Sequence, residues 1–466
     1  MTADQSAAGA SSAPALLVIA LATLLSLVVF TLPLTTIIAI GENFAISAGE
    51  QAWIMSGMPL GAAAGLLGAG ALGDNYGYKR TFQGGLVVLF ASSILGALAP
   101  DAFVLIVARV LQGIGCAAVT ACGLGLIGRL YDSSHDKARA AAIWAASLGA
   151  GVAIGPIVAA LLLPVGGWRS SHWMVVIATA LLVMLGHQLL PGRPDKRAAR
   201  PIDVPGSILL FIGMSCLLAS LTELRLGAYV IVGILAVIGV MGTALFIRTE
   251  LRSSNPILQL GLFKDAGFVG ATVAAFASGA GILSLMTLTP VMLEQGIGFS
   301  PFKAALVLTA WSAMTAVAAF LTRYLPRSLT PGLLLSVSIT GCLVGQLSLL
   351  FMAPDAGYVA VLPGLFVAGI SNGVLNASLG HQAVHHVPVE RSAMGSAANN
   401  TARYLGSSVG ITIIAIVIAN GAEHGGTAGL FEGWRQAIAI TGGFTVLGLI
   451  ALWIPMGRRR FMNRAH

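Results

Sequence analysis

The chain has 466 residues, of which 57% are hydrophobic and only 9% are charged, and its mean hydropathy is +0.90. Soluble proteins have about 25% charged residues, so this composition excludes an ordinary globular domain, a disordered chain and a coiled coil. It is typical of a protein whose solvent is the lipid bilayer. The four cysteines lie in apolar runs, which indicates packing roles, and neither a metal nor a cofactor is expected.

Apolar runs divide the chain into predicted membrane-spanning helices, each needing about 20 residues. Six runs precede a charged stretch, and the first is too long for a signal peptide: 14–40, 53–72, 81–99, 102–128, 138–163 and 172–190. Eight more runs follow, and a second polar stretch separates the first two of them from the last six: 204–222, 227–247, 268–292, 303–322, 331–352, 357–380, 394–419 and 433–455. The sequence thus predicts an all-α polytopic protein with 14 spans in a 6+2+6 grouping. Its expected parts are a six-helix bundle at 1–200, two linker helices at 201–250, and a second six-helix bundle with a basic tail at 251–466.

The basic residues support this count, because cytoplasmic connections are enriched in Lys and Arg. With a cytoplasmic N-terminus, 19 of the 25 fall in inside connections and the C-terminal tail, and two, Arg109 and Arg403, fall within or near spans. The remaining four are outside: Arg169, Arg225, Lys303 and Arg435. Both termini are therefore expected in the cytoplasm of a bacterium. The basic residues behind the net charge of +8 are expected at the inner face of the membrane, so this charge does not indicate a nucleic-acid surface.

A glycine-rich loop follows the second predicted span and ends in two basic residues: Gly70-Ala71-Leu72-Gly73-Asp74-Asn75-Tyr76-Gly77-Tyr78-Lys79-Arg80. Its carboxylate, Asp74, can meet a helix N-terminus or a cation across the seam between two bundles, and so hold one conformation closed. The spacing fits a plain turn with solvated charges equally well.

Arg109 lies about 12 Å deep in the fourth predicted span, at 1.5 Å per residue. A buried arginine costs about 2.5–3.5 kcal/mol on insertion scales, so it needs a function or an escape to the membrane interface. Gln112 shares its face of the helix at i+3. In the next span, Gly151, Gly155 and Pro156 predict a kinked, closely packed helix, which is either a gate or a passive bend.

Polar side chains recur in the last spans, where Asn372 and Asn376 share one helical face and Asn399 lies one turn from Arg403. They either line a substrate cavity or form hydrogen bonds between helices. The acidic residues, by contrast, all lie in connections, in tails or near helix ends, and Glu223 is the most embedded. Because lipophilic cations need a buried carboxylate or an aromatic cage, neutral or anionic amphiphiles are favoured as ligands.

Three segments of the first half, taken together, resemble the major facilitator superfamily. The loop Gly70–Arg80 resembles its signature loop, 105–115 its helix 4 motif, and 151–156 the helix 5 motif of its antiporters. The segments 401–410 and 252–268 are similar to the fourteen-span drug:proton antiporter branch.

The resemblance implies a proton-coupled antiporter that exports small amphiphiles by alternating access, which agrees with the absence of a GxxxxGK[ST] phosphate loop. It implies a conformational gate at Gly70, Asp74, Gly77, Lys79 and Arg80, proton coupling at Arg109 and Gln112, and an exchange-enforcing helix at Gly151, Gly155 and Pro156. The expected partners are a small-molecule substrate, protons and membrane lipids, around a functional monomer.

Two departures qualify the resemblance. Asn75 and Tyr78 stand where the family usually has basic residues, and the acid that its fourteen-span branch carries in helix 1 is missing. The hypothesis for coupling is therefore Arg109 together with Glu223. The alternatives are a lipid or siderophore exporter of the same fold, or a membrane-embedded transferase that would use the cluster His381, His385, His386 and Glu390.

Overall fold

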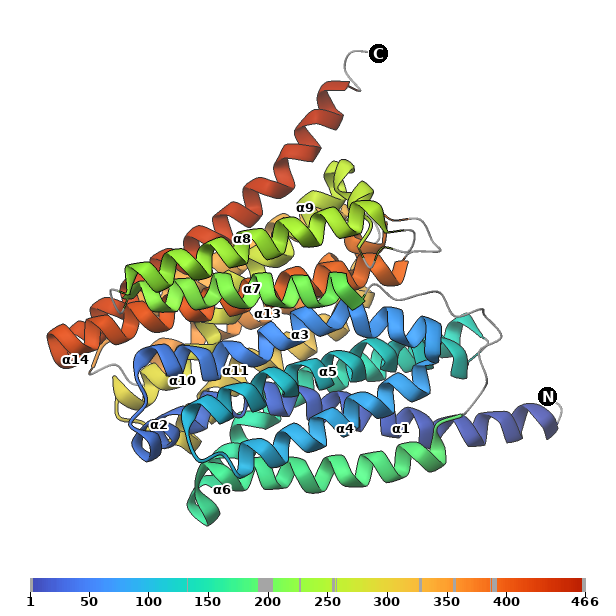
Figure 1. Ribbon diagram of the computed structural model, residues 1–466. Helices are drawn as coiled ribbons and strands as arrows, with labels where there is room; N and C mark the ends of the chain where they lie inside the picture. Colours follow the sequence, from blue (N-terminus) through green and yellow to red (C-terminus); the bar gives the residue numbers. More distant parts are fainter. Residues whose placement is uncertain are drawn as a thin grey trace.

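The computed structural model describes residues 3–131, 133–191, 204–225, 228–253, 256, 258–326, 329–354, 358–385, 387 and 392–462. The regular structure of these residues is entirely helical, and the helices run alongside one another as a bundle (Figure 1). Eleven stretches are long and apolar enough to cross a membrane. The predicted all-α polytopic architecture is confirmed at this level.

The first half of the bundle begins with a long helix that is followed directly by a shorter one. Pro33 has no N–H to continue the ladder of α1, so the chain restarts there as α2. Two later helices, α3 and α5, start at side-chain caps: the hydroxyl of Ser47 accepts from Glu50 N at 3.2 Å, and Asp101 accepts from Val104 N at 2.9 Å. The bounds are α1 Ala3–Thr31, α2 Pro33–Phe44, α3 Ala48–Tyr76, α4 Tyr78–Ala97, α5 Ala102–Leu130 and α6 Ser134–Leu189.

The second half also consists of long α-helices, and short 3-10 or π-helical turns lie between some of them. A π-helical turn, η2, joins α9 to α10 without a loop. The bounds are η1 Leu260–Lys264, α9 Ala266–Ser278, η2 Gly279–Leu283, α10 Ser284–Gln295, α11 Pro301–Leu321, η3 Thr322–Tyr324, α12 Pro331–Ser348, η4 Leu349–Phe351, α13 Tyr358–His385 and α14 Ser392–Met462.

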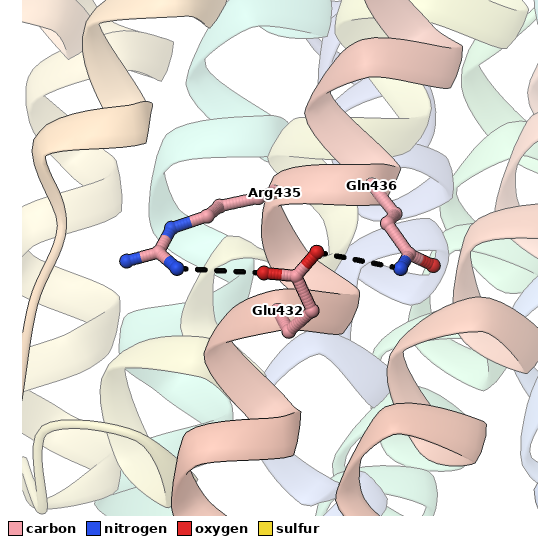
Figure 2. Close-up of polar contacts among 3 residues, drawn as sticks. All are labelled: Glu432, Arg435 and Gln436. Atoms are coloured by element: carbon pink, nitrogen blue, oxygen red, sulfur yellow. Dashed lines mark hydrogen bonds and ion pairs between the residues drawn. The ribbon is translucent and has the colours of Figure 1, made fainter.

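Two of these helices are far longer than a bilayer is thick and double back at glycines. The 56 residues of α6 contain non-helical backbone at Gly166 and Gly167, and the Ser170 hydroxyl beyond the break donates to Leu162 O at 2.8 Å. The 71 residues of α14 break at Gly426, whose φ of 56° is left-handed. Beyond that break, the exposed face of α14 carries Glu432, which accepts from Arg435 at 3.4 Å and from Gln436 at 3.5 Å (Figure 2).

Between the halves lies a helix pair, α7 Val204–Arg225 and α8 Tyr229–Arg252. The two pack on each other through Gly213 and Gly242, and α7 also lies against α3 and α14 (Figure 1). Most of α8 faces away from the bundle, where apolar side chains such as Val230 and Val237 are exposed. This is the surface that a lipid-facing helix presents.

Equivalent helices pair in the two halves. In the first half α1 packs on α6, and α5 packs on α3 and α4; in the second half α9 packs on α14, and α13 packs on α11 and α12. The halves meet along α3 with α14 and along α6 with α11. A single apolar core crosses this seam, since Ile37 of α2 and Trp168 of α6 share it with Leu285 of α10 and Trp434 of α14.

The tightest helix contacts are made by glycine. A Cβ atom on Gly61 of α3 would collide with the carbonyl oxygen of Val110, and one on Gly113 of α5 would collide with that of Met58. We expect Gly61→Ala to destabilise the protein by about 1–3 kcal/mol, because the two backbones must separate. Unfolding of the purified variant in detergent, followed by circular dichroism, measures this.

Gly84→Ala is the matched control, because Gly84 lies inside α4 with no atom within 4 Å of the added methyl group. It should leave stability unchanged or raise it slightly through helix propensity. Equal losses in both variants would show that the α3–α5 contact does not set the stability.

Candidate functional site

Arg109 is buried inside the first half, with 1% of its surface exposed. Its guanidinium donates to three backbone carbonyls: from Nη1 to Val29 O at 2.8 Å, from Nη2 to Phe30 O at 3.3 Å, and from Nε to Ile54 O at 3.4 Å. The side chain therefore ties α5 to α1 and α3. It does not extend to the membrane interface, which was the alternative considered from the sequence.

Gln112 completes this network. Its Oε1 accepts from Arg109 Nη1 at 2.8 Å, and its Nε2 donates to Ser93 Oγ of α4 at 3.1 Å. Four helices thus meet around one charge, which has neutral oxygen atoms as its hydrogen-bond partners. The predicted pair of Arg109 and Gln112 is brought together by the fold.

Glu223 does not join this network. It lies half-buried near the end of α7, a helix that packs on α8, α3 and α14. The hydrogen bonds of Arg109 end at α1, α3 and its own helix. The sequence hypothesis grouped the two residues because they were the most embedded charges of opposite sign, but embedding along a span says nothing about which helices are neighbours.

The segment 151–156 packs the first arm of α6 against α1 and α2. A Cβ atom on Gly155 would collide with Thr31 Oγ1, and one on Gly151 would collide with the carbonyl oxygen of Leu24. Thr35 of α2 donates to Pro156 O at 3.3 Å, an oxygen on the proline of the motif itself. These glycines serve a close contact with the helix whose carbonyls also hold Arg109.

The predicted glycine-rich loop is mostly helical, because residues 70–76 belong to α3 and residues 78–80 begin α4, so Gly77 alone forms the turn between them. Gly77 has a φ of 98°, which a side chain would strain, and its N–H donates to Gly73 O at 3.0 Å. A Cβ atom on Gly70 would have no neighbour within 4 Å. The Asp74 side chain, the predicted centre of the gate, lies outside what the structure describes.

The basic residue Lys79 of this loop contacts the end of α6. Lys79 Nζ donates to His187 O at 2.9 Å and to Leu190 O at 2.5 Å, so it caps the C-terminus of α6 within the same half. Arg80 is exposed. Tyr78 fits against Gly73 and Gly125, and the Arg129 guanidinium lies 4.3 Å from the centre of its ring.

The polar residues of the last helices divide into two kinds. Asn372 and Asn399 are buried and bond to neighbouring helices: Asn372 donates to Thr315 Oγ1 at 3.5 Å, and Asn399 donates to Ala271 O at 3.1 Å. Asn376 is half-buried and accepts from Arg403 Nη1 at 2.9 Å. Each of these asparagines thus forms a hydrogen bond to another helix, and the alternative that they line a substrate cavity stays a prediction.

A cluster that the sequence analysis missed lies where α2 ends and α6 turns back. Arg169 donates to Asn43 Oδ1 at 2.8 Å and to Ala99 O at 2.9 Å, and its guanidinium lies 4.2 Å from the ring centre of Trp168. Trp168 Nε1 donates to the same Asn43 oxygen at 3.2 Å. Charge counting predicts only that Arg169 lies outside, although an Arg next to Trp at a glycine break is a signal in the sequence.

Comparison with known proteins identifies the family. The model of the Major Facilitator Superfamily matches residues 19–411. The chain belongs to the major facilitator superfamily. The multidrug efflux pump LfrA of Mycolicibacterium smegmatis is 30% identical over 409 residues, 86% of this chain and 80% of LfrA. The multidrug resistance protein Stp of Mycobacterium tuberculosis is 28% identical over 82% of this chain and 71% of Stp.

Solved structures give the same fold at low sequence identity. A D-xylose-proton symporter superposes with a TM-score of 0.65 at 15% identity, covering 94% of this chain and 97% of the symporter. A POT family peptide transporter gives 0.68 at 14% identity, over 95% and 97% of the two chains. The major facilitator chain is therefore a transporter and not an enzyme, and it is a multi-pass protein of the bacterial cytoplasmic membrane, as predicted.

The contact between Gly155 and Thr31 can be tested by a pair of substitutions. Gly155→Ala should destabilise the protein by about 1–3 kcal/mol and lower transport, because the methyl group collides with the threonine hydroxyl. Adding Thr31→Ala removes that oxygen and should restore part of the loss. Detergent-solubilised melting curves and vesicle transport rates measure both effects. If the double variant is no better than Gly155→Ala, the clash with Thr31 is not what makes glycine necessary.

Proposed function

We propose that this major facilitator protein exports small neutral or anionic amphiphiles from the cytoplasm in exchange for protons. Arg109 is the observation that carries the proposal. A fully buried cation that bonds to the backbones of α1 and α3 is sensitive to any shift of these helices, so its bonds can differ between the two states of a carrier. Protons supply enough energy in principle, about 2.3 kcal/mol per charge per 100 mV.

Several relatives support an amphiphilic substrate. Besides LfrA and Stp, they include a puromycin resistance protein of Streptomyces alboniger, 26% identical over 90% of this chain and 86% of that protein. A probable actinorhodin transporter of Streptomyces coelicolor is 29% identical over 83% of this chain and 68% of that protein. Their names refer to antibiotics, which agrees with a drug, an antibiotic or a secreted metabolite as the transported compound.

We propose 14 spans with both termini in the cytoplasm. Eleven stretches qualify directly, and α6 and α14 supply one further span each by doubling back at Gly166–Gly167 and Gly426. The apolar helix Pro205–Leu221 within α7 supplies the last. The domains then follow the predicted bounds of 1–200, 201–250 and 251–466, in a monomer surrounded by lipid.

In this topology the end of the bundle that carries Gly167 faces outward, and it is closed. Ile37 and Ile40 of α2 share one buried core with Leu285 and Leu288 of α10, from the other half. Deeper in the seam, Phe30 of α1 lies 6.2 Å from Tyr404 of α14, measured between ring centres. Opening to the outside requires this apolar contact to part, which is the rocking motion expected of two related halves.

Proton coupling is tested with vesicles under an imposed pH gradient. We expect gradient-driven accumulation of a substrate in everted vesicles that carry the protein. Arg109→Gln should remove most of the gradient-dependent accumulation, because a neutral glutamine cannot replace the charged hydrogen bonds from the guanidinium to these carbonyls. Substrate exchange without a gradient should persist, and Arg435→Gln, at an exposed position outside every proposed site, is the control.

Glu223→Gln is added in the same assay, alone and together with Arg109→Gln. Coupling that uses both residues requires each single variant to lose gradient-driven transport. Loss with Arg109→Gln alone would remove Glu223 from the proposal. Intact gradient-driven export in the double variant would reject this coupling mechanism.

Substrate charge is tested by drug susceptibility in a pump-deficient bacterial host. We expect protection against neutral and acidic antibiotics and none against lipophilic cations, because the described acidic residues lie near helix ends or breaks and not in mid-span. Minimum inhibitory concentrations measure this. Resistance to lipophilic cations would contradict the proposal, and indifference to every compound would favour a dedicated metabolite, lipid or siderophore exporter.

A further inference from the structure

Arg403 is the second cation within the spans, and its surroundings differ from those of Arg109. It lies on the first arm of α14, inside the apolar stretch Gly395–Trp453. Its Nη1 donates to Asn376 Oδ1 at 2.9 Å, and its Nη2 donates to Asn400 Oδ1 at 3.0 Å. Both partners are neutral amides, so they orient the guanidinium without compensating its charge.

The hydrogen bonding of Arg403 is also incomplete. Its Nε atom is buried and has no hydrogen-bond partner, and no other Lys or Arg in the described part of the chain has such an atom. A buried N–H without a partner is unfavourable, and more so when the group is charged. Arg109, in contrast, has bonds from Nε and from both terminal nitrogens.

Access distinguishes the two arginines as well. Arg109 is enclosed, whereas Arg403 and its partners Asn376 and Asn400 are all half-buried. The same turn of α14 lies at the seam between the halves, because Thr401 Oγ1 donates to Ala63 O of α3 at 3.4 Å. Tyr404 packs against the buried ring of Phe30 of α1 there, and the Arg403 guanidinium lies 5.5 Å from the centre of the Tyr404 ring, so an aromatic pair adjoins the cation.

Among the side chains that the structure describes, no carboxylate bonds to Arg403, whose hydrogen bonds go to Asn376 and Asn400. The acidic side chains that the structure describes all lie within six residues of a helix end or break: Glu42, Glu50, Asp101, Asp136, Glu223, Glu250, Asp265, Glu294, Glu423 and Glu432. A planar guanidinium with free donors matches the two oxygens of a carboxylate. Because a single guanidinium here has no anionic partner among the described side chains, the ligand it can neutralise carries one negative charge.

We propose that Arg403 binds the acid group of the transported compound, so that the preferred substrate is a singly charged carboxylate with an aromatic or aliphatic body. This rests on the proposed export function and specifies its substrate class. Asn376 and Asn400 are positioning residues that present the guanidinium to the ligand. The aromatic pair Phe30 and Tyr404 contacts the apolar body.

The test compares an acid with its neutral analogue. Biphenyl-4-carboxylate and biphenyl-4-carboxamide have nearly the same shape and differ in charge, and calorimetric titration of the full-length protein in lipid nanodiscs gives both affinities. We expect the carboxylate to bind at least about tenfold more tightly than the amide, as for a hydrogen-bonded ion. Arg403→Gln should abolish the preference and leave amide binding unchanged.

Three further variants separate recognition from folding. Asn376→Asp places a carboxylate beside the guanidinium and should abolish the preference while keeping Arg403 in place. Arg403→Lys keeps the positive charge without the planar guanidinium and should retain part of the preference for the carboxylate. Arg435→Gln removes an exposed arginine of the same helix, one that already pairs with Glu432 (Figure 2), and should have no effect.

The outcomes separate this assignment from the proposed function. A preference that survives in both Arg403→Gln and Asn376→Asp, or a wild type that shows none or binds neither compound, overturns the assignment to Arg403. In those cases, transport of the amide into or out of proteoliposomes under a pH gradient would still support the proposed export function. A preference that depends on Arg403 without any gradient-driven transport would reject the exporter and keep the anion site.

Discussion

The bundle depends on close contact between helix backbones, because lipid tails are as apolar as leucine and provide no hydrophobic force between spans. Glycines supply these contacts in both halves. Gly61 and Gly113 join α3 to α5, and Gly369 brings α13 against the carbonyl oxygen of Trp311 in α11. The pair α9 and α14 meets through glycines on both sides, where Gly406 faces Phe276 O and the π-helical turn presents Gly279 to Arg403 O. Each half is thereby a stiff unit.

The seam between the halves is built differently. Gly149 packs against Ala316, and two hydroxyl bonds cross the interface, from Ser408 to Ser56 O at 3.1 Å and from Thr401 to Ala63 O at 3.4 Å. Around these contacts lie apolar side chains from both halves, which can part without leaving backbone groups unsatisfied. Contact between the halves thus relies more on side chains than contact within a half does, which suits a carrier whose halves move as bodies.

Much of the fold could be predicted from the sequence, because bilayer thickness fixes span length and embedded charge is rare. Arg109 and Arg403 were identified for that second reason. What bonds them could not be predicted, since the carbonyls of Val29, Phe30 and Ile54 leave no mark in the sequence. The partner of Lys79 was missed for the same reason. Glu223 was grouped with Arg109 on depth alone, and depth does not determine which helices are neighbours.

The absence of mid-span acids among the described residues bears on energetics as well as on recognition. A one-for-one exchange of a cationic drug for a proton moves no net charge, so only the pH difference drives it. Export of a monoanion with entry of one proton moves two positive charges inward, which is worth about 4.6 kcal/mol per 100 mV of inside-negative potential. A carrier that recognises its substrate with a guanidinium thus gains from the membrane potential twice. It has no need for the helix 1 carboxylate that a cation exporter would use to bind its substrate.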